Sequence, residues 1–371
     1  MVMGEAKSVG GHPSAREREN WLTGTLVLFC LASTVVTVVA GLIQVSFGEY
    51  SMTLRGAWEA VFNPAVIFNL EAWSSFLFGT EPPDVSTESV VVWSLRLPRV
   101  FVGVIAGATL AVSGAIFQAV TRNELASPFV LGVSSGAGFA VLATLVVFSG
   151  LSPFLPLIAA LGGTLAFLVV YTIAWKGGTS PVRLVLAGVI VNMVFQSLQQ
   201  GLFFFADDLG VVQSAIAWLT GSLTGTGWAE VRIAILPAIV AIALALAGSR
   251  QLNVLMLGES TARSLGMRVE RVRFLLSALA ILAASVAIAI AGVVSFFGLV
   301  VPHIVRNTVG SDYRRLMIGC AFAGPALLVT ADVAARLALG GVQMPVGVVT
   351  GLIGGPYFLY LMRKQRSMGE L

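Results

Sequence analysis

Long apolar runs separated by short polar segments dominate the pattern of this chain. One such run, residues 274–305, contains no Asp, Glu, Lys or Arg. As one helix it would extend about 48 Å, beyond the roughly 30 Å hydrocarbon core of a bilayer. Gly292 and Pro302 interrupt it, so we expect one full span, a bend and a second, broken span. Because broken helices persist in lipid only where protein or a water-filled cavity covers the freed backbone groups, many neighbouring helices are predicted.

The same pattern predicts ten membrane spans. Ten spans place both termini on one side, with a cytoplasmic tail at 1–20, one transmembrane domain at 21–363 and a second cytoplasmic tail at 364–371. The positive-inside rule supports this orientation, because only five of the 22 Lys and Arg residues fall outside. These five are Arg55, Arg96, Arg99, Arg232 and Arg336. The predicted spans lie at residues 21–47, 100–121, 128–149, 154–175, 184–205, 233–249, 274–291, 293–306, 316–334 and 343–362.

Composition agrees with a membrane protein. Hydrophobic residues make up 57% of the chain and charged residues 11%, against about 25% charged residues in soluble domains. The pI of 9.4 does not indicate a nucleic-acid partner, because Lys and Arg punctuate the gaps between apolar runs and form no patch. Cys30 and Cys320 lie in apolar runs, which is typical of packing residues and not of a metal site or a disulfide. We therefore expect an all-α polytopic membrane protein.

Two outer segments have compositions typical of the membrane surface. Segment 48–95 contains Trp58 and Phe62, and we expect a short interfacial helix there, since Trp and Phe favour the headgroup level. Segment 206–232 mixes Trp and Gly, which predicts a short helix lying on the membrane surface.

Small residues recur at every fourth position in two predicted spans. Such ridges allow helix backbones to approach closely. Packing within the chain is the simpler interpretation of both ridges, and a subunit interface is the alternative for the second. The first ridge is Gly103, Gly107 and Ala111, and the second is Gly347, Gly351 and Gly355.

Residues 250–273 form the one sizeable cytoplasmic loop that the pattern predicts. Five arginines and two glutamates share it with several Leu, Val and Met residues. Ser260 is positioned to cap a helix that begins at Thr261, and Gly266 to end it. Two interpretations follow: an amphipathic helix on anionic lipid, or a docking surface for a soluble partner.

Five segments resemble a known family in the same order along the chain. They are LRLPRVFVGVIAGATLAVSGAIFQAVTRNELASPFVLGVSSGAG, LGESTARSLG, GVVSFFGLVVPHIVR, ADVAARLA and MPVGVVTGLIGGPYFLYLMRK. These segments resemble the FecCD/BtuC-type permeases of bacterial ABC importers, which import iron siderophores, haem and cobalamin. The resemblance extends from about residue 90 to 363 and does not include the N-terminal tail.

The resemblance implies a type II ABC importer in the cytoplasmic membrane. Such an importer contains two copies of a ten-helix permease, two cytoplasmic ATP-binding subunits and an extracytoplasmic substrate-binding protein. ATP and Mg²⁺ would bind to the ATPase, and this chain would hold no cofactor or metal. The family inserts the loop equivalent to 250–273 into the ATPase, which favours docking over lipid binding. The residues assigned to this coupling loop are Leu257, Gly258, Glu259, Ala262, Arg263, Leu265 and Gly266.

The resemblance also gives a role to the outer arginines. Arg96, Arg99 and Arg336 match family positions that receive glutamates of the binding protein. Arginine suits this role, because its planar fork binds a carboxylate and stays charged. Interaction with lipid headgroups is the alternative. Asp332, four residues before Arg336, is expected to pair with it on one helix face.

The gate and the pathway are assigned in the same way. The cytoplasmic gate matches Asn123, Leu125, Thr179 and Ser180, but Glu124 stands where the family has proline, which leaves the stiffness of that loop open. Spans 184–205 and 343–362 match the helices that line the pathway between two copies. The pathway candidates are Asn192, Gln196, Gln199, Gly347 and Gly351, although the amides could instead bond between helices. His303 is interpreted as structural, bonding to backbone freed by Pro302, in preference to a haem ligand or proton carrier.

The leading hypothesis is a permease subunit that imports an iron chelate, either a ferric siderophore or haem. Cobalamin import is the alternative within the family. An ion-coupled secondary transporter is remote, because such proteins need intramembrane charges and Asp332 is the only acidic residue inside a predicted span. An enzyme is not expected, since the sequence contains no P-loop and no clustered His, Glu and Asp site. ATP hydrolysis must therefore reside on another subunit.

Overall fold

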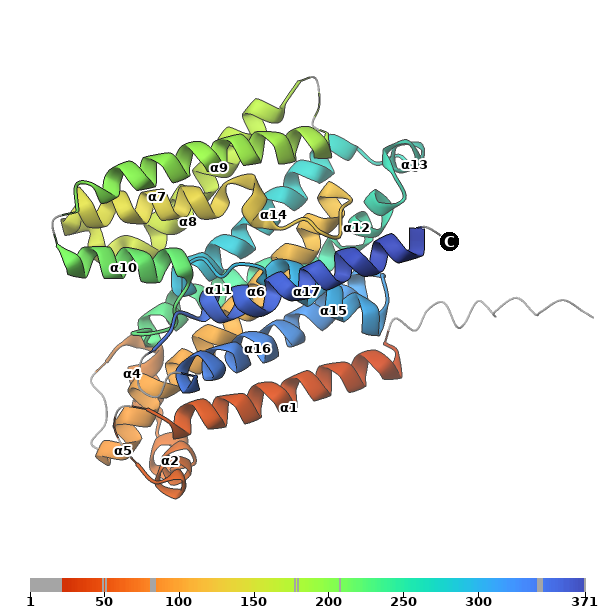
Figure 1. Cartoon of the computed structure of the whole chain (residues 1–371). Helices are drawn as coiled ribbons and strands as arrows, with labels where there is room; N and C mark the ends of the chain where they lie inside the picture. Colours follow the sequence, from red (N-terminus) through yellow and green to blue (C-terminus); the bar gives the residue numbers. More distant parts are fainter. Residues whose placement is uncertain are drawn as a thin grey trace, which may run out of the picture.

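Helices make up almost all of the structure. The computed structural model describes residues 22–369 except 49, 51, 81–84, 177, 179, 207 and 339–342, and that part of the chain contains no strand. Its helices are α1 (Gly24–Ser46), α2 (Leu54–Val61), α3 (Pro64–Ile67), α4 (Leu70–Phe78), α5 (Thr87–Val90), α6 (Leu97–Thr121), α7 (Val133–Val146), α8 (Leu155–Ala174), α9 (Pro181–Phe203), α10 (Leu209–Thr220), α11 (Trp228–Ala247), α12 (Ser249–Met256), α13 (Glu259–Ser264), α14 (Val269–Ala291), α15 (Phe297–Val309), α16 (Tyr313–Leu337) and α17 (Val346–Gly369). The long helices lie side by side, with α2 near one end of the bundle and α13 at the other (Figure 1). We call these the α2 end and the α13 end.

Each of the ten predicted spans contains a helix, which confirms the all-α polytopic fold. Within the described residues, seven helical segments are long and apolar enough to cross a membrane, and three shorter apolar helices accompany them. The second span is longer than predicted, because α5, a π-helical turn at Val91–Arg96 and α6 are continuous over Thr87–Thr121. α7 begins later than predicted, since Pro128–Leu131 forms a 3₁₀ turn that Gly132 ends at a φ of 76°.

α6 and α14 form the centre of the bundle and are buried along most of their length. α6 packs against α11, α14, α15 and α16. The approach to α16 is close, because a Cβ atom on Gly107 would lie 2.6 Å from the carbonyl oxygen of Gly324. On the same ridge, a Cβ atom on Gly103 would contact Val329, and Ala111 faces Gly324. The first glycine ridge therefore packs within the chain.

The uncharged stretch 274–305 bends at the predicted glycine. α14 ends at Ala291, and Gly292 turns the chain away at a φ of 67°. α15 begins after Phe296, a non-glycine residue with a φ of 62°. The predicted break at Pro302 is wrong, because α15 continues through it from Phe297 to Val309.

Pro302 still leaves one backbone group without its helical partner. Since proline has no N–H, the carbonyl of Gly298, four residues earlier, loses its donor. Helix α6 covers that carbonyl: a Cβ atom on Gly114 would lie only 1.8 Å from the Gly298 oxygen. Because residue 114 is glycine, the backbones of α6 and α15 meet directly. Neighbouring protein thus covers the carbonyl that Pro302 leaves without a donor, which is a condition for proline in a membrane-spanning helix.

The prediction for segment 206–232 is wrong, because its helix does not lie across the membrane surface. α10 runs alongside α7, and its C-terminal end reaches the bend between α14 and α15 (Figure 1). The chain turns inward here because the backbone groups freed at this bend need partners. We call this meeting point, formed by residues 218–222, 291–293 and 347, the junction. Its hydrogen bonds run from the amide of Ser222 to the carbonyl of Ala291 (2.9 Å), from Val293 to Trp218 (2.9 Å) and from Gly347 to Gly221 (3.2 Å).

The predicted short helix around Trp58 is present as α2. Its Trp58 is half exposed, and the indole N–H donates to Ser46 Oγ at the end of α1 (3.0 Å). α2 and α4 share a small separate core with the segment before α6, which includes Phe76 and Trp93 in a stacked pair. The α2 end is therefore a packed cap and not a loose loop.

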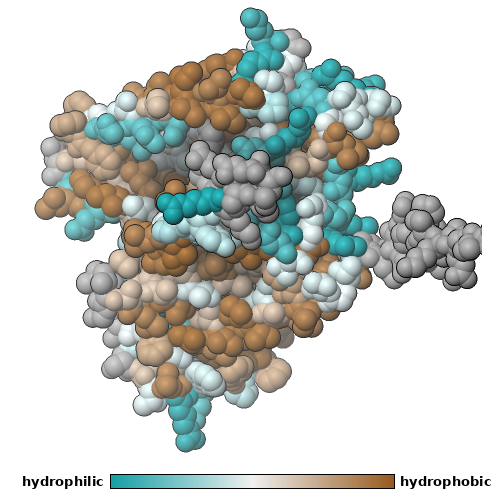
Figure 2. Space-filling view, turned by 45° about the vertical axis from the view of Figure 1, so that its right-hand side comes forward, coloured by the Kyte–Doolittle hydropathy of each residue, from teal (hydrophilic) through white to brown (hydrophobic). Residues whose placement is uncertain are grey.

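Hydrophobic side chains cover broad areas of the molecular surface (Figure 2). Many exposed leucines, isoleucines and valines lie on α1, α8, α9 and α11, as expected of helices that face lipid. The second glycine ridge behaves differently from the first. A Cβ atom on Gly347 would clash with the Thr220 carbonyl, whereas Gly351 and Gly355 face open space. Gly351 and Gly355 of this ridge are therefore free for contact with another molecule.

Candidate functional site

Three predicted docking arginines meet at one cavity near the α2 end. The cavity has a volume of about 450 Å³, and its lining includes Arg96, Arg99, Arg336 and Gln343. Residues 224–227 complete one wall. The described lining residues include no Asp or Glu, and the buried Asp332 behind Arg99 offsets one of the three positive charges. Arg96 and Arg99 are close in the sequence, and the fold brings the distant Arg336 to them.

Arg99 is held by a buried carboxylate. Its Nε and one terminal nitrogen each donate to Asp332 at 2.8 Å, and the other terminal nitrogen donates to Gln343 Oε1 at 2.9 Å. Asp332 is fully buried and also accepts a hydrogen bond from Gln44 Nε2. This Arg99 node joins α1, α6, α16 and the segment that leads to α17.

The predicted pairing of Asp332 with Arg336 is therefore wrong. Asp332 lies on the face of α16 that packs against α1 and α6, where Arg99 reaches it. Arg336 is half-buried and donates instead to the carbonyl of Gln44 (3.1 Å). A spacing of four residues places Asp332 and Arg336 within reach of each other on α16. The packing of α16 instead brings Arg99 to Asp332 and the carbonyl of Gln44 to Arg336.

The outer arginines also stabilise helix ends. Arg96 is buried and donates to the carbonyls of Val45 (2.6 Å) and Tyr50 (2.5 Å), so Arg96 and Arg336 both bind the C-terminal turn of α1. Arg232 donates to the carbonyl of Phe76 (3.3 Å) in the last turn of α4. Cations at these positions complement the negative end of the helix dipole.

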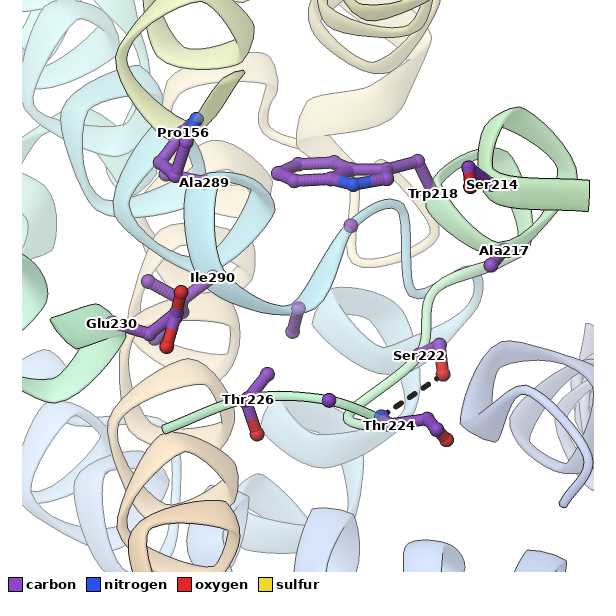
Figure 3. Close-up of a pocket in the computed structure, with 13 residues that line it drawn as sticks. Pro156, Ser214, Ala217, Trp218, Ser222, Thr224, Thr226, Glu230, Ala289 and Ile290 are labelled. Carbon is purple, nitrogen blue, oxygen red and sulfur yellow. Dashed lines mark hydrogen bonds between the residues drawn. The ribbon is translucent and has the colours of Figure 1, made fainter. Parts of the chain in front are cut away.

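A second polar cavity lies beside the junction and was not predicted. Its volume is about 250 Å³, and Figure 3 shows Trp218, Ser222, Thr226 and Glu230 around it, next to the end of α14. The Glu230 carboxylate accepts from the amide of Gly227 (2.7 Å) and caps α11. The run of Gly, Ser and Thr at residues 220–227 was the available sequence signal for a polar wall here.

The predicted coupling loop folds as two short helices, α12 and α13. α13 begins at Glu259 after Gly258, whose φ is 103°, so the predicted cap at Ser260 lies two residues too late. Gly266 ends the helix as predicted: its amide donates to Arg263, and the amide of Met267 donates to Ala262. This pair of bonds is the Schellman pattern, and the φ of 79° at Gly266 permits it.

The coupling loop presents leucines outward. Leu257 and Leu265 are 61% and 63% exposed, whereas Ala262 between them is fully buried. Exposed leucines flanked by Arg263 form a compact apolar patch of the kind that marks a protein interface.

The described gate candidates each make a local hydrogen bond. The side chain of Asn123 accepts from the amide of Leu125 (2.9 Å) and closes a tight turn. Ser180 caps α9 by accepting from the amide of Arg183 (3.2 Å), and Thr179 lies outside the described residues. Glu124, which replaces the family's proline, lies 3.5 Å from Arg306 in an ion pair. The turn is therefore held by a side-chain hydrogen bond and by a link to α15.

The pathway candidates differ in exposure. Gln199 is buried and donates to the carbonyl of Ser135 (2.7 Å), so it bonds between α9 and α7. Asn192 is half-buried and Gln196 is exposed on α9. Gly347 is packed into the junction, and Gly351 borders open space. Asn192, Gln196 and Gly351 thus stay accessible, and Gln199 and Gly347 have structural partners. His303 is buried, with its ring edge-on to Tyr357.

The profile of the FecCD transport family matches residues 36–364. The chain belongs to this family. The match begins well before the first of the five segments that carried the resemblance, so it includes the second half of α1 and the α2 end.

Relatives with assigned roles support the same conclusion for this FecCD chain. The Fe(3+)-citrate import system permease protein YfmD of Bacillus subtilis is 41% identical over 77% of this chain and 85% of its own. The vitamin B12 import system permease protein BtuC of Vibrio cholerae is 41% identical over 75% of this chain and 84% of its own. A solved structure described as an inward-facing metal-chelate type ABC transporter matches with a TM-score of 0.76 and 26% identity, covering 91% of this chain and 99% of its own.

These matches confirm the predicted class. The FecCD chain is a membrane-embedded permease of the type II ABC importer kind. Identity does not separate the substrates, because the iron-citrate and vitamin B12 permeases are equally similar to it.

Proposed function

We propose that this permease forms the import pathway for an iron chelate, a ferric siderophore or haem, which a substrate-binding protein delivers. It would work as two copies of this chain with two ATP-binding subunits that carry ATP and Mg²⁺. The α13 end would face the cytoplasm together with both termini, and the α2 end would face outward across the cytoplasmic membrane.

The arginine cavity is the observation that favours a ferric chelate. Its described lining contains three arginines and no Asp or Glu, and Asp332 offsets the charge of only one of them. A cleft of one charge attracts ligands or partners of the opposite charge. Ferric citrate and many ferric siderophores are anionic. Similarity to YfmD supports the same choice. Cobalamin is the second candidate, supported by the equal similarity to BtuC of Vibrio cholerae.

Uptake by the reconstituted importer tests this proposal. Proteoliposomes containing the permease, its ATPase and its binding protein are expected to accumulate radiolabelled iron supplied as a citrate or siderophore chelate, and only with ATP. Leu257→Glu with Leu265→Glu should reduce uptake at least tenfold, because charged side chains at the centre of an interface disrupt docking. Both leucines are exposed, so the variant keeps its core.

Ser311→Glu is the matched control for added charge. Ser311 is exposed at the α13 end but lies outside α12 and α13, and uptake should equal that of the parent. If the complex hydrolyses ATP but takes up cobalamin and no ferric chelate, the iron proposal is wrong and the cobalamin alternative holds.

Arg336 gives the sharper test of docking to the binding protein, because Arg96 and Arg99 are buried and hold the fold together. Arg336→Glu should weaken docking about tenfold at low salt, since it replaces an attraction to a carboxylate with repulsion, and the loss should shrink as salt rises. Surface plasmon resonance with the purified complex measures this affinity. Arg55→Glu, on an exposed face of α2 away from the cavity, is the control; an equal loss in both variants contradicts the assignment.

A further inference from the structure

Arg273 is the most unusual charge at the α13 end. It is the last cation before the uncharged stretch 274–305 and is only 1% exposed, which makes it the largest fully buried side chain of the described residues. One terminal nitrogen lies 2.5 Å from Glu259 Oε1, and the other lies 3.4 Å from Glu270 Oε1. Glu259 is the first residue of α13, and Glu270 lies in the first turn of α14.

Carboxylates are what permit this arginine to be buried. Arg273 sits near the N-terminus of α14, where the helix dipole disfavours a positive charge. A buried charge is tolerated only when it is paired, and the planar fork of arginine can reach two carboxylates at once. The pair therefore requires α13 to stay on the first turns of α14.

This contact adds a second link between α13 and α14. The chain between the two helices turns at Gly266, where the amides of Gly266 and Met267 donate to carbonyls of α13. These bonds fix the turn to α13, whereas the Glu259–Arg273 pair reaches α14. Glu259 and the buried Ala262 hold the inner side of α13, whereas Leu257 and Leu265 flank the helix and are exposed. A force applied to the leucines would thus reach α14 through the Glu259–Arg273 pair.

α14 extends from this contact to the junction. It is an unbroken helix of 23 residues, buried over most of its length. Its last carbonyl, at Ala291, accepts from Ser222, and the next residues bond to the end of α10. The start of α17 is bonded to the same place through Gly347 and Gly221. A shift of α14 would therefore displace the start of α17, the helix that carries the pathway candidate Gly351.

We propose that Arg273 is the positioning residue that transmits movement of α13 to α14 and so couples ATP hydrolysis to opening of the pathway. The inference rests on the proposed function, because it assigns a force-bearing contact to the ATPase-docking loop of that importer. The chain itself supplies both partners of the contact.

The test compares transport with ATP hydrolysis in one assembled complex. Arg273→Gln should still assemble with the ATPase, because the exposed leucines are intact, but substrate imported per ATP hydrolysed should fall at least tenfold. Arg273→Lys keeps the charge but not the fork, and should lie between Arg273→Gln and the parent. Glu259→Gln removes the other partner of the pair at a half-exposed site and should lower substrate import per ATP hydrolysed in the same way. It provides the test if Arg273→Gln does not fold.

Two controls decide the outcome. Arg271→Gln removes an exposed arginine two residues away and should keep the parent's ratio of import to hydrolysis. The double variant Glu259→Gln with Arg273→Gln should be no worse than the poorer single variant, because residues that act through one contact are not additive. A parent-like ratio in an assembled Arg273→Gln complex, or an equal fall in Arg271→Gln, overturns the inference. A parent complex that imports nothing contradicts the proposed function instead.

Discussion

Replacing Asp332 with Asn is expected to lower the free energy of unfolding by about 3–5 kcal/mol, the usual cost of removing one partner of a buried ion pair. Asp332 is fully buried and binds Arg99 through two oxygens, so the change leaves a guanidinium buried without its counter-charge. Because the Arg99 node joins α1, α6 and α16, the loss should appear as a lower melting temperature. Thermal unfolding of the purified protein in detergent, followed by tryptophan fluorescence, measures it.

The Arg55–Glu59 pair offers a matched comparison on the same protein. Its N–O distance is also 2.8 Å, but its side chains are 88% and 65% exposed. Glu59→Gln should cost at most about 1 kcal/mol, because water screens exposed charges. Arg99→Met with Asp332→Leu should be more stable than Asp332→Asn, since removing both charges leaves neither one unpaired. Equal melting of Asp332→Asn and Glu59→Gln would show that the node is not a stabilising pair.

The largest effect of any single methyl group is expected at Gly114. A Cβ atom there would lie 1.8 Å from the Gly298 oxygen, and the neighbouring atom is backbone that cannot rotate away. Gly114→Ala should therefore force α6 and α15 apart and cost more than about 3 kcal/mol, at the upper end of overpacking changes. The yield of folded protein by size-exclusion chromatography and its melting temperature check this.

Gly201→Ala is the control for the same substitution. Gly201 lies in α9 with no atom within 4 Å of an added Cβ, and alanine favours helix over glycine by about 1 kcal/mol. This variant should be neutral or slightly more stable. If Gly114→Ala melts like Gly201→Ala, then α6 and α15 do not pack as closely as the structure places them.

The charged residues inside the fold have more than one use. Arg96 and Arg336 bind the C-terminal carbonyls of α1 and also line the arginine cavity. A binding protein that docks at this cavity would therefore act on the side chains that hold α1 against α16. Glu124, which departs from the family pattern, binds Arg306 and connects the gate turn to α15.

The sequence alone determined the fold class and where the helices of the ten predicted spans lie along the chain. Uncharged runs of span length can satisfy their backbone in lipid only as helices, so composition and hydropathy were sufficient for that conclusion. The bend at Gly292 and the end of α13 at Gly266 were also predictable, because the conformational freedom of glycine is a local property. The family's ordered motifs gave the transporter class, which the family profile confirmed.

Only the tertiary structure decided the partners. Asp332 binds Arg99, 233 positions away in the chain, and not Arg336 on its own helix, because burial of one face of α16 brings α6 to that carboxylate. The inward path of α10 was equally hidden, since the Trp218 carbonyl at its end accepts from the amide of Val293, and the following Ser222 donates to Ala291. Helical spacing reports which residues share a face of one helix. Which helix covers that face depends on the packing of all the helices in the bundle, and the sequence of one segment does not contain that information.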